Sequence, residues 1–386
     1  MFKRNVLAVS MTLAALCTAQ AAMADINGGG ATLPQPLYQT TGVLTAGFAP
    51  YIGVGSGNGK AAFLNNDYSK FVPGVTNKNV HWAGSDSKLS TTELTGYSAA
   101  HGAAWGPLIQ VPSVATSVAI PFNKAGTAAV DLSVSDLCGV FSGRVNLWEQ
   151  IPSSGRTGEI VVVYRNEASG TTELFTRFLN AKCSEAKPFA ITTNFSASYG
   201  TLPPKAVAAV TSQGVMDALN AGDGRITYMS PDYAAPTLAG LDDATKVARI
   251  GGVSPAPSNV SAAIAAVPVP AAANRSNPNA WVPVFAATTS ADPSVVPYPS
   301  SGYPILGFTN LVFSQCYADA TQTSQVRTFF GRHYGALVNN DAAINSNRFV
   351  PLPASWKTAV RDTFVTASNG LSIGNTSVCN AIGRPL

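Results

Sequence analysis

The chain has 386 residues, of which 46% are hydrophobic and only 11% are charged. This length is enough for two domains of ordinary size, and the composition is that of a compact globular protein rather than a disordered one. The formal net charge of +4 is close to neutral and the Lys and Arg residues do not cluster, which excludes a basic nucleic-acid-binding surface.

The first 24 residues have the pattern of an export signal. Lys3 and Arg4 form a basic start, residues 6–16 are a short apolar run, and Ala22-Met23-Ala24 is a small-x-small cleavage site. The apolar run is too short to span a bilayer. We therefore expect a signal peptide over residues 1–24, cleavage near Ala24/Asp25, and a mature protein that is periplasmic or secreted.

The cysteines predict two disulfides. Cys17 follows a leucine, where a lipid-anchor site needs a small residue, so we assign it to the discarded leader. The remaining four are an even number, which favours pairing in an exported protein. We expect Cys138–Cys183 and Cys316–Cys379, because cysteines close in sequence more often share a domain; the alternative is free buried thiols. No CxxC pair occurs and the three histidines stand apart, so we expect no metal and no cofactor.

Two glycine-rich turns open the mature chain, each between a short strand and a helix. The first is DINGGGATLP at residues 25–34, with a helix starting near Pro36. The second is YIGVGSGNGK at residues 51–60. It is not a P-loop, because Val54 stands at the first glycine of that motif and Ala61 at its Ser or Thr.

A third strand and turn, VHWAGSDS at residues 80–87, carries the carboxylate of Asp86 at its tip. The sequence leaves two interpretations open. Asp86 could face a ligand together with the two glycine-rich turns, or it could simply cap the helix that follows.

Residues 161–179, VVVYRNEASGTTELFTRFL, repeat the pattern in the middle of the chain. Strand-like residues run into a polar turn and then into apolar residues at helical spacing. The start of a helix presents backbone N–H groups to an anion, and Arg165 adds a charge and a planar set of donors. This pattern predicts an oxyanion site. The alternative is an ordinary turn with a surface arginine.

The rest of the chain continues the alternation of strands and helices. We expect a crossing between domains at residues 108–122, interrupted by Pro112 and Ser113, and a strand that belongs to a second crossing at residues 303–313. Helices are expected within residues 132–148 and near 260–266, 326–337 and 355–364. Such alternation is typical of an α/β fold with parallel sheets, in which ligands bind at the carboxyl ends of the strands.

The motifs together resemble one family. The start DINGGGATLPQPLYQ resembles that of the DING proteins, which are phosphate-binding proteins of the phosphate ABC transporter family. GVGSGNG, AGSDSKL, LCGVFSGRVNLW and YRNEASGTTELFTRFL follow in the expected order, so the resemblance covers nearly the whole mature chain. It implies a two-lobed periplasmic-binding-protein fold, with a mostly parallel sheet and flanking helices in each lobe and the ligand in the cleft. We expect lobe I over residues 25–112 and 301–386, and lobe II over residues 113–300.

The resemblance also implies a function and a binding site. We expect a monomer that binds inorganic phosphate with high affinity and delivers it to an ABC transporter permease, without catalytic residues. Many members of the family have Asp two residues after the site arginine; this chain has Glu167, which we expect to orient the guanidinium. The implied phosphate-binding residues are Thr32, Leu33, Ser56, Asp86, Arg165, Ser169, Gly170 and Thr171.

An ionised Asp86 would suit phosphate, because a carboxylate only accepts hydrogen bonds and bound phosphate has an O–H to donate. Two alternatives remain open. An exported phosphatase-like phosphoester hydrolase is one, although no GxSxG motif occurs and Ser56, Ser85 and Ser87 lack a nearby base. The other is an extracellular interaction protein that retains the fold, with the Ala/Pro/Ser-rich residues 268–299 as its partner surface.

Overall fold

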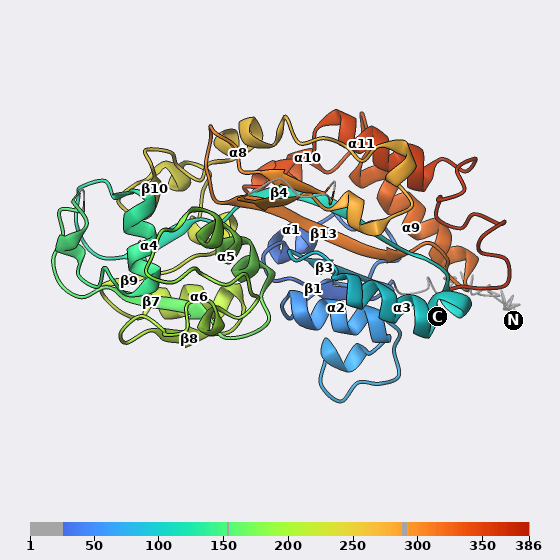
Figure 1. Cartoon of the computed structure of the whole chain (residues 1–386). Coiled ribbons are helices and arrows are strands. Elements are labelled where there is room, and N and C mark those ends of the chain that lie inside the picture. Colours follow the sequence, from blue (N-terminus) through green and yellow to red (C-terminus); the bar gives the residue numbers. More distant parts are fainter. Residues whose placement is uncertain (1–25, 153, 288–291, 293, 386) are drawn as a thin grey trace, which may run out of the picture.

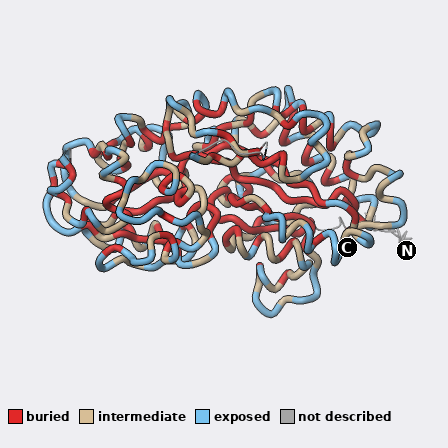
Figure 2. Tube along the Cα trace, in the orientation of Figure 1, coloured by how far each residue is buried: buried red, intermediate tan, exposed pale blue. Residues whose placement is uncertain are grey.

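The computed structural model describes residues 26–152, 154–287, 292 and 294–385. The predicted signal peptide therefore lies outside the described residues. Two six-stranded sheets form the centres of two lobes, with lobe II on the left and lobe I on the right in Figure 1. Figure 2 shows the strands of both sheets as mostly buried segments beneath more exposed helices. The expected two-lobed α/β fold is confirmed.

Lobe I is built on the sheet β14-β4-β13-β3-β1-β2. Only the neighbours β2, β1 and β3 pair in parallel here. β13 pairs antiparallel with both β3 and β4, and β14 pairs antiparallel with β4, so the sheet is mixed. Its strands are β1 (Gly28–Gly30), β2 (Ile52–Gly53), β3 (Trp82–Ser85), β4 (Leu108–Ser117), β13 (Leu306–Ser314) and β14 (Val350–Pro351). The helices are α1 (Gln35–Gln39), α2 (Ser56–Asn65), α3 (Thr91–Trp105), α9 (Ala320–His333), α10 (Asp341–Ser346) and α11 (Ala354–Val360).

Lobe II is built on the sheet β6-β10-β5-β9-β7-β8, which is also mixed because β5 is antiparallel to both its neighbours. Its strands are β5 (Ile120–Asn123), β6 (Asp131–Leu132), β7 (Val161–Arg165), β8 (Val207–Ala209), β9 (Arg225–Ile226) and β10 (Val247–Ile250). The helices are α4 (Val134–Ser142), α5 (Gly170–Lys182), α6 (Thr211–Asn220) and α7 (Pro231–Ala234). The later elements are α8 (Pro257–Ile264) and a two-stranded sheet of β11 (Val284–Ala286) and β12 (Val295–Pro297).

The crossings between the lobes differ from the expected boundaries. β4 continues in the lobe I sheet through residue 112 to Ser117, and β5 starts the lobe II sheet at Ile120. Pro112 does not end the strand, because it pairs with Asn310 where the register of β13 shifts, and such a bulge tolerates a residue without an N–H.

The return crossing comes before residue 300. The Ser117 hydroxyl donates to the Pro255 carbonyl at 2.9 Å, and α8 packs on β4 and β14 of lobe I. β13, expected as part of the second crossing, lies wholly in the lobe I sheet. The segment between α8 and β13 touches both lobes, since β11 contacts α5 of lobe II and residues 278–281 contact β4 of lobe I.

The two longest strands, β4 and β13, lie in the hydrophobic core along their whole length. All ten residues of β4 and all nine of β13 are buried, as expected for strands covered on both faces. None of the described helices is long and apolar enough to cross a membrane.

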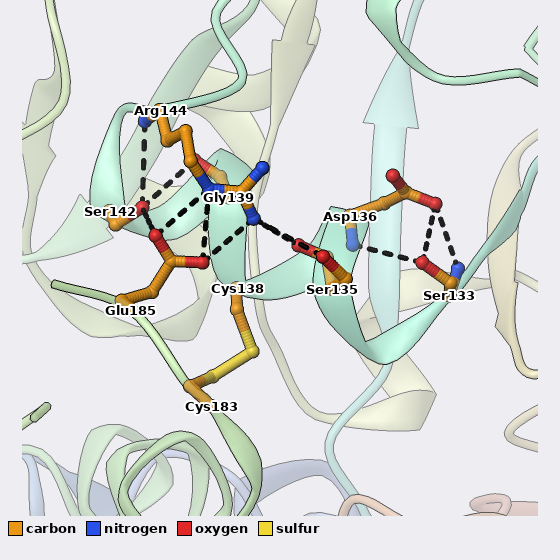
Figure 3. The surroundings of a disulfide bond; sticks show 9 residues. All are labelled: Ser133, Ser135, Asp136, Cys138, Gly139, Ser142, Arg144, Cys183 and Glu185. Atoms are coloured by element: carbon orange, nitrogen blue, oxygen red, sulfur yellow. Dashed lines mark hydrogen bonds and ion pairs between the residues drawn. A yellow bond between two sulfur atoms is a disulfide. The ribbon is translucent and has the colours of Figure 1, made fainter.

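Both expected disulfides are present. Cys138 of α4 is bonded to Cys183, which directly follows α5, so that these helices are held together (Figure 3). Beside this bond, Arg144 pairs with Glu185 at 2.7 Å, and its hydrogen bonds lower the pKa of the Glu185 carboxyl. The second bond, Cys316–Cys379, attaches the C-terminal segment to lobe I.

We expect that replacing Cys316 and Cys379 together by alanine lowers the free energy of unfolding by about 2–4 kcal/mol, because the bond closes a long loop in the unfolded chain. The two cysteines are 63 residues apart. Denaturant unfolding of the variant and the wild type measures the difference. The pair Cys138 and Cys183, 45 residues apart, serves as a matched comparison in lobe II. Unfolding curves that coincide with the wild type would contradict the prediction.

Candidate functional site

The turns predicted to bind an anion meet between the two lobes. Ser56 begins α2, Asp86 follows β3, and Gly170 begins α5. A Cβ built on Gly170 would lie 2.4 Å from the Ser56 hydroxyl oxygen and 2.6 Å from the Asp86 Cβ. This close approach requires glycine at position 170 and brings lobe II directly against two residues of lobe I. Across the same contact, the Thr171 hydroxyl donates to Asp86 Oδ2 at 3.2 Å.

Within lobe I, the turn after β3 is fixed by Ser56. The Asp86 N–H donates to the Ser56 hydroxyl at 3.1 Å. Asp86 does not cap the following helix, because α3 begins at Thr91 and is capped by Ser90 in a capping box with Glu93. The structure therefore excludes one of the two interpretations of Asp86, that of a helix cap.

Arg165 lies at the end of β7 with only 3% of its surface exposed. Its Nε donates to Glu167 Oε1 at 2.8 Å, and its Nη2 contacts the same oxygen. Glu167 Oε1 also accepts the Thr211 N–H at 2.8 Å. The glutamate at this position therefore pairs with the arginine, as an aspartate would, and holds a second turn as well. The Arg165 N–H donates to the Tyr228 hydroxyl at 3.2 Å.

The first glycine-rich turn contacts lobe II through Thr32 and Leu33. The Thr32 hydroxyl lies 2.9 Å from the Ser212 hydroxyl and accepts the Ser212 N–H at 3.2 Å. The Leu33 carbonyl accepts a hydrogen bond from the Ser230 hydroxyl at 3.4 Å. The turn adjoins Asp86 as well, since β1 and β3 are paired neighbours.

A backbone contact joins the lobes beside these side chains. The Gly57 N–H donates to the Ala168 carbonyl at 3.0 Å. On the lobe II side, Ser169 is the N-cap of α5 and its hydroxyl oxygen accepts the Thr172 N–H at 3.2 Å. A hydroxyl that accepts in a cap keeps its hydrogen for another partner. The hydrogen bond between Gly57 and Ala168 thus shows that the two lobes are in direct contact at this site.

The electrostatics centre on Asp86, of which 4% is exposed. Burial raises its pKa from 3.8 to about 6, although the Thr309 hydroxyl, the charge of Arg165 and the Thr171 hydroxyl act in the opposite direction. Asp86 Oδ1 and the Thr309 hydroxyl are both buried, and among the described residues neither makes a hydrogen bond of ordinary geometry, although Thr309 is close enough to Asp86 to lower its pKa. An unpaired buried acceptor costs free energy, so the site is suited to a ligand that brings a donor to this oxygen.

The predicted site residues thus gather at the contact between the lobes, and three further residues join them. Ser212 and Thr211 come from the start of α6, and Tyr228 follows β9. The sequence analysis missed them. The sequence Val-Thr-Ser at residues 210–212 could have revealed Thr211 and Ser212, because it has the same pattern as the other turns: a strand end followed by hydroxyl residues at a helix start. The part of the chain that the structure describes contains no group of three or more residues able to hold a metal ion.

Comparisons with known proteins give the family. The model of the PBP superfamily domain matches residues 18–322. The chain is 72% identical over 393 aligned residues to a Pseudomonas aeruginosa (strain UCBPP-PA14) protein named Alkaline phosphatase L, with full coverage of both chains. It is 68% identical over 378 residues to a Phosphate-binding protein from an unknown prokaryotic organism, which covers 94% of this chain and 100% of that protein.

A solved structure agrees with these relatives. It is that of a high affinity periplasmic phosphate-binding protein (PfluDING) bound with phosphate at pH 8.5. That structure matches with a TM-score of 0.92 and 75% identity, over 94% of this chain and 100% of the other. The chain therefore belongs to the PBP superfamily and, within it, to the DING proteins.

Proposed function

We propose that this protein binds one inorganic phosphate ion between its lobes, with high affinity. The observation that carries the proposal is the buried Asp86, whose Cβ lies opposite the start of α5 and whose Oδ1 makes no hydrogen bond of ordinary geometry among the described residues. A phosphate O–H satisfies this acceptor, and the hydroxyls, backbone N–H groups and guanidinium around it suit the other oxygens. The ligand set we propose is Thr32, Leu33, Ser56, Asp86, Arg165, Ser169, Gly170 and Thr171, with Glu167 behind the arginine.

The pairing of Arg165 with Glu167 limits the positive charge that the ligand meets. Selectivity then comes mainly from Asp86. Sulfate carries no proton near neutral pH, so its oxygen would face the carboxylate with no hydrogen between them. A repulsive contact of this kind discriminates against a ligand more strongly than added attraction favours another.

Calorimetry tests the proposal. The protein is unfolded in denaturant with its disulfides intact, dialysed free of phosphate, refolded and titrated with phosphate and with sulfate. We expect one phosphate per chain and much weaker binding of sulfate. A refolded protein that takes up no phosphate would overturn the proposal.

We further propose that the mature protein is an exported monomer that delivers phosphate to an ABC transporter permease. The leader-like residues 1–24, the two disulfides and the periplasmic relative support export. Cell fractionation and light scattering of the secreted or periplasmic protein measure location and mass. Uptake of labelled phosphate by cells with and without the gene tests the transport role.

Hydrolysis of phosphoesters is the second candidate, because a relative at 72% identity is named Alkaline phosphatase L. The residues favour binding instead. The Ser56 hydroxyl already accepts the Asp86 N–H, and among the described residues it makes no hydrogen bond to a histidine. Ser113 does lie 2.9 Å from His333 Nε2, but both are buried in lobe I, where burial lowers the histidine pKa to about 4. An aryl phosphate turned over by the wild type and not by Asp86→Asn would favour the enzyme.

A role as an interaction protein has less support. The described part of residues 268–299 is not a free surface loop, since Trp281 and Phe285 are buried there. The Trp281 indole N–H donates to the Arg275 carbonyl at 2.9 Å, which ties the segment to itself. We propose that this segment is a structural part of the fold.

A further inference from the structure

The turn that starts α6 is held in an unusual backbone conformation. Thr211 has a φ of 60°, in the left-handed region that β-branched residues rarely adopt. Two hydrogen bonds hold it there. Its N–H donates to Glu167 Oε1 at 2.8 Å, and its own hydroxyl accepts the Gly214 N–H at 3.2 Å. Strain of this kind persists only where the surroundings impose it, and it is concentrated at functional sites.

The strained turn presents Ser212 to the opposite lobe. Ser212 is 2% exposed, and both its N–H and its hydroxyl contact the Thr32 hydroxyl, at 3.2 and 2.9 Å. Thr32 and Ser212 are 180 residues apart and belong to different lobes. This contact therefore exists only when the lobes are together.

The contact controls which way the Thr32 hydroxyl can donate. A hydroxyl has one hydrogen to donate and two lone pairs that accept. One lone pair accepts the Ser212 N–H, and the Ser212 hydroxyl can donate to the other. With both lone pairs engaged, the Thr32 hydrogen is left for a third partner. An unprotonated phosphate oxygen, which only accepts, selects this arrangement over the one in which Thr32 donates to Ser212.

We propose that Ser212 is a positioning residue that turns Thr32 into a hydrogen-bond donor for the bound phosphate once the lobes close. Glu167 links this action to Arg165, because one carboxylate oxygen accepts from both the guanidinium and the Thr211 N–H. An anion held by Arg165 and a turn held by Glu167 are thus parts of one hydrogen-bonded unit. The inference rests on the proposed function.

The test is a double-mutant cycle with Thr32→Val, Ser212→Ala and the double variant. We expect Ser212→Ala to raise the phosphate dissociation constant about 5- to 30-fold, the equivalent of one buried hydrogen bond. The dissociation rate should account for most of the change, since the contact forms after the anion has entered. Stopped-flow exchange of phosphate measures both rates, and in the Thr32→Val background the Ser212→Ala substitution should have little further effect.

Two variants serve as controls. Gln213→Ala removes an exposed neighbour that bonds only Asp217 within α6 and should leave both rates unchanged. Ser212→Thr retains the hydroxyl and should restore slow dissociation, which a general loss of packing would not allow. If the wild type binds phosphate and Ser212→Ala releases it at the wild-type rate, or if its effect is equal with and without the Thr32 hydroxyl, the role of Ser212 is refuted. A wild type that binds no phosphate refutes the proposed function instead.

Discussion

Replacing Arg165 by alanine should weaken phosphate binding several hundredfold, more than the loss of any single hydroxyl at the site. The substitution removes a buried charge from the proposed anion site and leaves the Glu167 carboxylate without its partner. Breaking a buried ion pair from one side costs about 3–5 kcal/mol, and each 1.4 kcal/mol is tenfold in affinity. The unpaired Glu167 carboxylate would also repel the phosphate anion. Calorimetry with the phosphate-free protein gives the loss directly.

Arg144→Ala is the matched control for this experiment. Arg144 also pairs with a carboxylate in lobe II, Glu185, but it lies beside the Cys138–Cys183 disulfide (Figure 3), and its guanidinium hydrogen bonds go to Glu185 and Ser135 rather than to a residue of the proposed site. We expect wild-type phosphate affinity for this variant. Deletions of single hydroxyls, Thr171→Val and Ser169→Ala, complete the series. An Arg165→Ala protein that binds phosphate better than either of these would contradict the proposed role of the guanidinium.

Replacing Asp86 by asparagine should reduce the preference for phosphate over sulfate by about a hundredfold, the effect of a few kcal/mol of mismatch. The amide can donate a hydrogen bond to a sulfate oxygen, which the carboxylate cannot do. Most of the change should therefore come from tighter binding of sulfate. Titrating the variant and the wild type with both anions at pH 8 measures it, and an unchanged ratio would rule out Asp86 as the source of selectivity.

The same carboxylate predicts a dependence of sulfate binding on pH. Burial raises the Asp86 pKa from 3.8 to about 6, so the ligand-free closed form is ionised above pH 6 and protonated below it. A protonated carboxyl donates to sulfate, whose own charge does not change in this range. We expect wild-type affinity for sulfate to rise as the pH falls from 8 to 5, whereas Asp86→Asn should bind sulfate equally across it. A flat wild-type profile would contradict the prediction.

The pKa also has a consequence for stability. A carboxyl whose pKa is raised by folding contributes stability that is complete below pH 3.8 and is lost as the pH rises through about 6. Phosphate, by satisfying the ionised form, should therefore stabilise the protein most strongly above pH 6. Melting temperatures with and without phosphate, at pH 5 and at pH 8, measure this effect. We expect phosphate to raise the melting temperature more at pH 8 than at pH 5.

The local parts of the site could be predicted because their chemistry is local. Strand residues, glycines and hydroxyls in sequence mark the starts of α2 and α5, and these helices begin at Ser56 and Gly170. The alternative for Asp86 could also have been settled, since Ser90 and Glu93 form a capping-box pattern three residues apart in the sequence. Arg165 and Glu167 are two residues apart, so their pairing could also be predicted from the sequence.

Other parts depend on contacts that no local pattern encodes. The meeting of Thr32 and Ser212 requires both lobes to be in place, and the positive φ of Thr211 is imposed by Glu167 from another turn. The full length of β4 could not be predicted from the sequence either. Pro112 predicts an interruption, yet a register shift in the partner strand β13 absorbs it, and that shift is a property of the pair of strands.

The backbone contact between Gly57 and Ala168 sets how far the lobes can close. A Cβ on Gly57 would stand 2.3 Å from the Ala168 Cβ, well inside the distance at which two carbon atoms repel. A Gly57→Ala substitution would therefore keep the two lobes from closing fully. The smallest possible side chain at position 57 is thus a condition for full enclosure of the ligand, although the residue itself need not touch it.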